Sequence, residues 1–267
     1  MRIFVLILVF LCLTSSAAMD AKQIVIYKYL KQQLNQELIK NPGNKVKIVY
    51  TRFLTSKTVD QTWSGYFVSM KLNVSNGKES ETRFFRSVLF TDGKYVTDEL
   101  STPLGDQIAA DLTPKVTKDM YDAEHYVCGN KNALHKLVLF TDPLCPACRI
   151  AMPKILKKVR QNPTLFALYV YHYPLINLHP KSEEIVKGVI SLTRAGKKDI
   201  FDKVYTEDIS SAEDLRRMYG SYKITQKDVV NYKKDLEATE RLAVVGTPSL
   251  YFDGVLDPFG KKFFSKK

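Results

Sequence analysis

The sequence has few cysteines and no long apolar runs. Only four of its 267 residues are cysteine, which is too few to build a scaffold from disulfides. The apolar run Ile3–Leu13 is shorter than the about 20 residues that a transmembrane helix needs, and no later run is longer. A second Cys-x-x-Cys pair and a His-x-x-x-His pattern are both missing, so a four-ligand zinc site is disfavoured and no metal is expected.

The composition is that of an ordinary globular protein. Hydrophobic residues make up 45% of the chain and charged residues 25%, which argues against a coiled coil, a collagen or general disorder. The formal net charge of +12 is spread along the chain, so it indicates solubility, and no nucleic-acid partner is expected. The length fits one large domain or two modest ones.

Residues 1–18 have the three parts of a secretory signal peptide. Arg2 supplies the positive start, the apolar run follows, and the small residues Ser15–Ala18 suit a signal peptidase. A buried helix or a membrane anchor is the alternative. Cleavage near Ala18 would remove one positive charge and Cys12, leaving +11 and three cysteines. We therefore expect an exported protein of the bacterial periplasm, where disulfides persist.

The next part of the chain predicts a helix and a small antiparallel sheet. Residues 20–40 carry apolar side chains at three- and four-residue spacing, which indicates a helix. Alternating segments rich in β-branched and aromatic residues, separated by polar turns, predict strands at Val46–Leu54, Trp63–Val74, Arg83–Thr91 and Lys94–Asp98. We expect an N-terminal domain over 19–105, followed by a polar linker over 106–132.

Residues 133–267 alternate strand and helix signals and predict a second domain. The expected order is a strand at His135–Phe140, a helix at Cys145–Arg160, a strand at Leu165–Tyr173 and a last strand at Ser249–Phe252. Only helical signals occur over about 180–242, so this segment reads as a helical insertion. The lysine pairs near the C-terminus are typical of a solvated tail. The fold class predicted for the whole chain is α+β.

The motif Cys145-Pro146-Ala147-Cys148 lies where a strand leads into a helix. Proline suits the first helical position, which places Cys145 at the helix N-terminus, where free N–H groups and the helix dipole favour a thiolate. A thiolate is the form that attacks a disulfide. Cys148 lies one turn further on, less exposed but close enough to resolve a mixed disulfide. The pair therefore predicts dithiol–disulfide chemistry.

Two structural explanations of this pair compete with redox chemistry. A disulfide across one helical turn would stabilise little, because so short a loop removes little entropy from the unfolded chain. Zinc would need further ligands, for which only His125 and Cys128 are candidates. Cys128 by itself could be a buried small hydrophobe, a regulatory thiol or half of an intermolecular bridge, with the buried residue favoured.

The stretch Asp142-Pro143-Leu144-Cys145-Pro146-Ala147-Cys148 resembles the active site of periplasmic disulfide isomerases of the DsbC/DsbG type. Gly246-Thr247-Pro248, directly before a strand, is similar to the substrate-binding cis-proline loop of that family, and the resemblance implies a cis Thr247–Pro248 bond. It also implies an N-terminal dimerisation domain, a linker and a thioredoxin fold with a helical insertion. The second disulfide that the family often carries in the insertion is missing, since the insertion contains no cysteine.

The resemblance implies a periplasmic thiol–disulfide oxidoreductase, first of all a homodimeric disulfide isomerase or reductase. Cys145 would attack mispaired disulfides of unfolded exported proteins, and a membrane redox partner would keep it reduced. No cofactor is expected beyond the Cys145–Cys148 pair itself. Cys-Pro-x-Cys also occurs in DsbA-type oxidases, so a dimeric oxidase is the alternative. A periplasmic holdase chaperone, with redox activity secondary, is the hypothesis from another class.

Overall fold

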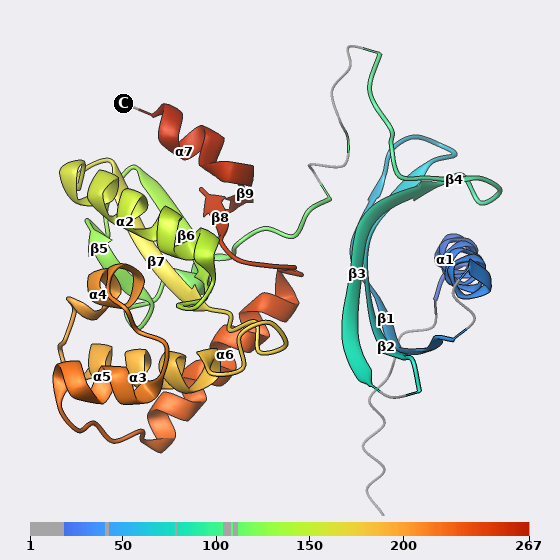
Figure 1. The fold of residues 1–267 in the computed structure, drawn as a ribbon. Helices are drawn as coiled ribbons and strands as arrows, with labels where there is room; N and C mark the ends of the chain where they lie inside the picture. Colours follow the sequence, from blue (N-terminus) through green and yellow to red (C-terminus); the bar gives the residue numbers. More distant parts are fainter. Residues whose placement is uncertain (1–18, 41–42, 78, 104–107, 109–111, 267) are drawn as a thin grey trace, which may run out of the picture.

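The computed structural model describes residues 19–40, 43–77, 79–103, 108 and 112–266, and they form two β-sheets with separate hydrophobic cores (Figure 1). The proposed signal peptide, residues 1–18, lies outside the described residues. Within the described ranges, every helix is too short or too polar to cross a lipid bilayer.

The first sheet is antiparallel and has the order β1-β2-β3-β4. Its strands are β1 (Lys45–Thr58), β2 (Ser64–Ser75), β3 (Ser80–Thr91) and β4 (Val96–Thr97). Helix α1 (Ala21–Lys40) packs on one face, where Ile26 and Leu30 are buried against apolar residues of β2 and β3. The helix and the strands predicted for this region are confirmed. The spacing of apolar residues was sufficient to find them because one face of each element is buried.

The second sheet has the order β5-β7-β6-β8-β9. Its strands are β5 (Tyr126–Gly129), β6 (His135–Thr141), β7 (Phe166–His172), β8 (Ser249–Phe252) and β9 (Val255–Leu256). Strands β6 and β7 are parallel and are joined by helix α2 (Pro146–Gln161), while the other pairs are antiparallel. This is a thioredoxin-like arrangement, and the α+β fold class is confirmed.

Four helices lie between β7 and β8, in the segment predicted as a helical insertion. They are α3 (Ser182–Arg194), α4 (Ile200–Thr206), α5 (Ala212–Tyr219) and α6 (Gln226–Arg241). Helix α6 begins with a capping box, in which the Thr225 side chain and the Asp228 side chain each bind the other's backbone N–H. One core joins α2, α3 and α4 to one face of the sheet, and a second core includes residues of α6 on the other face.

Two segments differ from the sequence-based expectation. The segment 106–132, predicted as a linker, contains the 3-10 helix η2 (Lys118–Met120) and ends in β5, which pairs with β7 as an edge strand of the second sheet. The C-terminal residues, predicted as a solvated tail, form η3 (Pro258–Gly260) and α7 (Lys261–Ser265). The Phe263 side chain anchors this tail, since it is fully buried against the main core.

Candidate active site

Cys145 and Cys148 lie at the start of α2, close to the end of β6. Cys145 is the N-cap residue of the helix, and Pro146 occupies the first helical turn as predicted. Both cysteines are free thiols. Cys145 is 7% exposed and Cys148 is fully buried, which matches the predicted order of accessibility, while Pro146 and Ala147 are exposed beside them.

The loop Gly246-Thr247-Pro248 lies against the first cysteine. The Thr247–Pro248 peptide bond is cis, as the resemblance implied. The Cys145 thiol donates a hydrogen bond to the Thr247 carbonyl, with an Sγ–O distance of 3.3 Å. The contact follows from sheet topology, because β8 begins right after this loop and pairs with β6, with Ser249 opposite Phe140. The structure therefore brings together the two predicted segments, whose contacting residues Cys145 and Thr247 are 102 positions apart in the sequence.

The carboxylate of Asp142 organises the loop that carries the cysteines. It is fully buried and accepts hydrogen bonds from the Leu144 N–H at 2.8 Å, the Leu175 N–H at 2.9 Å and the Ser182 hydroxyl. His179 Nδ1 lies 2.8 Å from the same carboxylate. One side chain thus ties the motif loop to the segment that follows β7 and to α3. Sequence reasoning missed this network, since Leu175, His179 and Ser182 lie 33 to 40 residues from Asp142 in the sequence.

Arg149 makes a second set of hydrogen bonds that hold the active-site loop in place. Its guanidinium donates to the carbonyl of Pro143 at 2.9 Å and to the carbonyls of Glu207 and Ile209 in the loop after α4. Three acceptors held by one planar group fix the first turn of α2 against the helical insertion. A single arginine in a sequence gives no signal of this role.

Polar groups surround the buried thiol of Cys148. Burial raises the pKa of Cys148 to about 12, while the hydroxyls of Thr141 and Thr247 and a backbone N–H oppose the rise because they favour the thiolate. The hydroxyl of Tyr205, on α4, faces the same cluster. None of these three hydroxyl oxygens has a regular hydrogen-bond partner among the described residues, which is unusual for buried polar atoms.

Exposed apolar side chains lie on the elements that converge on Cys145. They are found on α2, in the loop after β7 and next to the cis-proline loop: Ile150, Ile176, Leu178 and Val245. Large apolar residues that are exposed around a reactive group are typical of a binding surface.

A second buried polar cluster is centred on His125. Its Nδ1 lies 2.8 Å from Asp122, its Nε2 lies 2.7 Å from Asp235, and its ring stacks on Tyr171. Burial alone would lower the pKa of His125, but hydrogen bonds to the two carboxylates outweigh it and raise the pKa to about 9. From the sequence His125 was a candidate only as a further zinc ligand, whereas in the structure it bridges the carboxylates of Asp122 and Asp235.

Cys128 belongs to β5 and lies apart from the cysteine pair. It is partly buried against the main core, and burial raises the pKa of its thiol to about 11. A thiol held in this way is a weak nucleophile. Across the described residues, no three His, Cys, Asp or Glu side chains gather as metal ligands would.

Comparison with known proteins finds similar solved structures only. No protein-family model and no curated protein matches the sequence. A linker-deletion mutant of Proteus mirabilis ScsC is 22% identical, with a TM-score of 0.46, over 54% of this chain and 74% of that one. A thioredoxin-like oxidoreductase from Silicibacter pomeroyi is 20% identical, with a TM-score of 0.46, over 53% and 88%. BdbD from Bacillus subtilis is 16% identical, with a TM-score of 0.42, over 54% and 88%. Such distant likenesses leave the activity to be inferred from the site itself.

Proposed function

We propose that the protein is a thiol–disulfide oxidoreductase in which Cys145 attacks the disulfides of exported polypeptides and Cys148 resolves the mixed disulfide. The observation that carries this proposal is the position of Cys145. Cys145 is the N-cap residue of α2, and its thiol donates a hydrogen bond to the Thr247 carbonyl of the cis-proline loop at 3.3 Å. Cys148 lies one turn further along α2 and is fully buried.

The surroundings of Cys145 suit an extended, partly apolar polypeptide as substrate. The loop before β8 offers backbone groups to a neighbouring extended chain, a form of strand addition. The exposed apolar residues defined above would contact side chains that a folded client hides, so unfolded or mispaired exported proteins are the proposed clients.

We favour an isomerase or reductase over an oxidase. Thr247, directly before the proline, resembles the residue that isomerases and reductases carry at this position. Shuffling a disulfide requires Cys145 to be reduced, so the protein needs an electron donor such as a membrane reductase.

We propose further that the protein works in the periplasm as a homodimer through residues 19–105, with the first sheet also available for client binding. Light scattering of the full mature chain and of a chain without residues 19–105 tests the dimer.

The thiol state of the Cys145–Cys148 pair in cells distinguishes an isomerase or reductase from an oxidase. Acid quenching followed by alkylation with a mass tag reports how much of the Cys145–Cys148 pair is reduced. A mostly reduced pair supports the isomerase or reductase, and a mostly oxidised pair supports the oxidase. In vitro, the wild type should reactivate scrambled ribonuclease, while Cys145→Ser should not. If Cys145→Ser still suppresses client aggregation but the wild type shows no thiol exchange, the holdase hypothesis replaces this proposal.

A further inference from the structure

We propose that a cavity between the second sheet and the helical insertion binds a small organic anion, whose acidic group pairs with lysines that line it. The cavity has a volume of about 300 Å³, at the lower end of the range for pockets that hold small ligands. Strands β5 and β7 contribute to one side of it, and α3, α4 and α6 contribute to the others. Its lining includes neither cysteine of the motif nor the cis-proline loop, so binding here is separate from the redox reaction.

Positive charge in the lining exceeds what nearby carboxylates neutralise. Five basic side chains line the cavity: His125, Lys131, Arg194, Lys198 and Lys227. Three of them have a carboxylate partner: Arg194 pairs with Asp228, Lys227 with Glu124 and His125 with Asp235. Asp122, the second carboxylate on His125, lines a neighbouring cavity instead. Lys131 and Lys198 have no carboxylate within 4 Å among the described residues, so their charges are free to attract an anion.

His172 brings a buried polar atom without a partner to this cavity. Its side chain is 4% exposed, and its Nδ1 has no hydrogen-bond partner among the described residues. Burial lowers the pKa of His172, so the ring is neutral near pH 7 and carries one N–H that can donate to an anion. A buried polar atom left unpaired is unusual in a folded protein, and it points to a partner from outside the chain.

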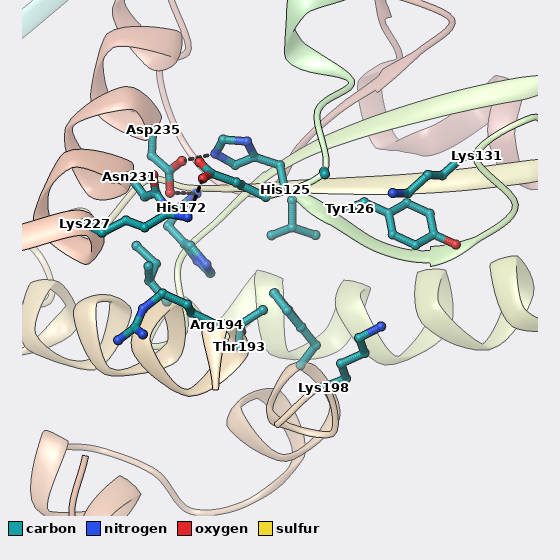
Figure 2. Close-up of a pocket in the computed structure, with 15 residues that line it drawn as sticks. His125, Tyr126, Lys131, His172, Thr193, Arg194, Lys198, Lys227, Asn231 and Asp235 are labelled. Carbon is teal, nitrogen blue, oxygen red and sulfur yellow. Dashed lines mark hydrogen bonds and ion pairs between the residues drawn. The ribbon is translucent and has the colours of Figure 1, made fainter. Parts of the chain in front are cut away.

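Thr193 brings a second such atom on the opposite wall. Its Oγ1 is buried and also lacks a hydrogen-bond partner among the described residues. Figure 2 shows His172 and Asp235 on one wall of the cavity, with Thr193 and Arg194 of α3 facing them. Ordered water would satisfy both polar atoms, but it would leave the charges of the two unpaired lysines without a counterion. An anion between the walls meets both needs.

Apolar side chains give the cavity room for more than an inorganic ion. Val170 of β7, Ile190 of α3 and Phe201 of α4 are part of its lining. Ligand sites of this kind combine an apolar surface with a few polar groups that orient the ligand. The lining therefore fits a compact molecule with a hydrocarbon or aromatic body and one acidic group, either a carboxylate or a phosphate.

Isothermal titration calorimetry of the full mature chain, in Tris buffer near pH 7, tests the site with defined probes. Phenylphosphonate and benzoate carry an acidic group on an aromatic ring, benzyl alcohol is a neutral counterpart, and inorganic phosphate is an acidic group alone. We expect one molecule of either aromatic anion to bind per chain, with a dissociation constant of about 0.1–1 mM for a ligand of this size. The tighter of the two identifies the preferred acidic group.

The other two probes show which part of the ligand is recognised. Inorganic phosphate should bind about tenfold more weakly than phenylphosphonate because it lacks the apolar body, and benzyl alcohol should give no heat of binding. No binding of either aromatic anion would overturn the proposal and leave a cavity that holds water only. Benzyl alcohol as tight as benzoate would also overturn it, since the charge would then play no part.

Two neighbouring lysines provide a matched pair of variants. Lys197 and Lys198 are both exposed, but only Lys198 lines the cavity. We expect Lys198→Gln to weaken phenylphosphonate binding about fivefold, as does Lys131→Gln, and Lys197→Gln to leave it unchanged. Equal weakening by Lys197→Gln and Lys198→Gln would mean general attraction of an anion to a basic protein, and it would refute the site.

Thr193→Val tests the wall opposite His172. The Thr193 hydroxyl has no partner within the described chain, so its removal should not lower the melting temperature. Loss of a hydrogen bond to the ligand should weaken phenylphosphonate binding about 2- to 10-fold. Binding to Thr193→Val as tight as to the wild type would contradict the placement of the ligand between the two walls.

Discussion

Replacing Asp142 by Asn tests whether the buried carboxylate holds the active-site loop. One oxygen accepts the Leu144 N–H at 2.8 Å, and the other accepts the Leu175 N–H at 2.9 Å and lies 2.8 Å from His179. Whichever way the new amide is turned, one of the two backbone N–H groups is left without an acceptor, at a cost of about 1–3 kcal/mol. Loss of the hydrogen bonds to a charged acceptor adds about 1.5–3 kcal/mol. We therefore expect the free energy of unfolding in urea to fall by about 2.5–6 kcal/mol.

Amide hydrogen exchange gives the local readout. The loss of one acceptor at 1–3 kcal/mol corresponds to about 5- to 150-fold faster exchange at Leu144 or Leu175. Asp257→Asn is the matched control, because Asp257 is also a buried carboxylate that accepts two backbone N–H groups, those of Lys262 and Phe263. This variant should lose stability without faster exchange in the active-site loop. Asp142→Asn as stable as wild type, with unchanged exchange at both amides, would refute the reasoning.

Three further predictions follow from buried contacts. The pKa of His125 is raised from 6.5 to about 9 in the folded protein, so its charge contributes about 3 kcal/mol that is fully present below pH 6.5 and is lost as the pH rises through 9. The difference in unfolding free energy between wild type and His125→Gln should shrink by about that amount between pH 6 and pH 10 in urea titrations, and a constant difference would contradict the pairing with Asp235. Gly129→Ala should fail to fold or unfold well below the wild-type temperature, because Gly129 has φ +95° and a Cβ there would lie 2.0 Å from the Phe166 carbonyl oxygen; an unchanged melting temperature in calorimetry would argue against this geometry. Arg149→Lys should cost about 1–3 kcal/mol in urea unfolding, since one ammonium cannot serve three carbonyls, and a neutral effect would mean that those contacts contribute nothing.

The parts of the structure that were predicted from the sequence are those with a local signal. Apolar spacing identified α1 and the strands β1 to β3, and the cysteine motif identified the start of α2. Strand β5 was missed because its four residues are half-buried at a sheet edge and show no clear alternation. The short C-terminal helix was missed because one buried phenylalanine, Phe263, outweighs the lysines around it.

Of the site residues, only those that belong to a short sequence motif were predicted. Cys145, Cys148 and the segment Gly246–Pro248 could be named because each stands in a recognisable short pattern. The partners of Asp142 come from the loop after β7 and from α3, and such contacts depend on how the helices pack. The same holds for Thr141 and His172, which become neighbours only through the pairing of β6 with β7.

The claim that Cys145 is the attacking nucleophile is tested most directly by trapping its adduct. A Cys148→Ser variant cannot resolve a mixed disulfide, so reaction with a peptide that contains one disulfide should leave a covalent adduct on Cys145, visible by mass spectrometry. Cys145→Ser, which keeps the buried Cys148, should form none under the same conditions. An adduct on Cys148 at the same rate, or no adduct on either variant, would contradict the account.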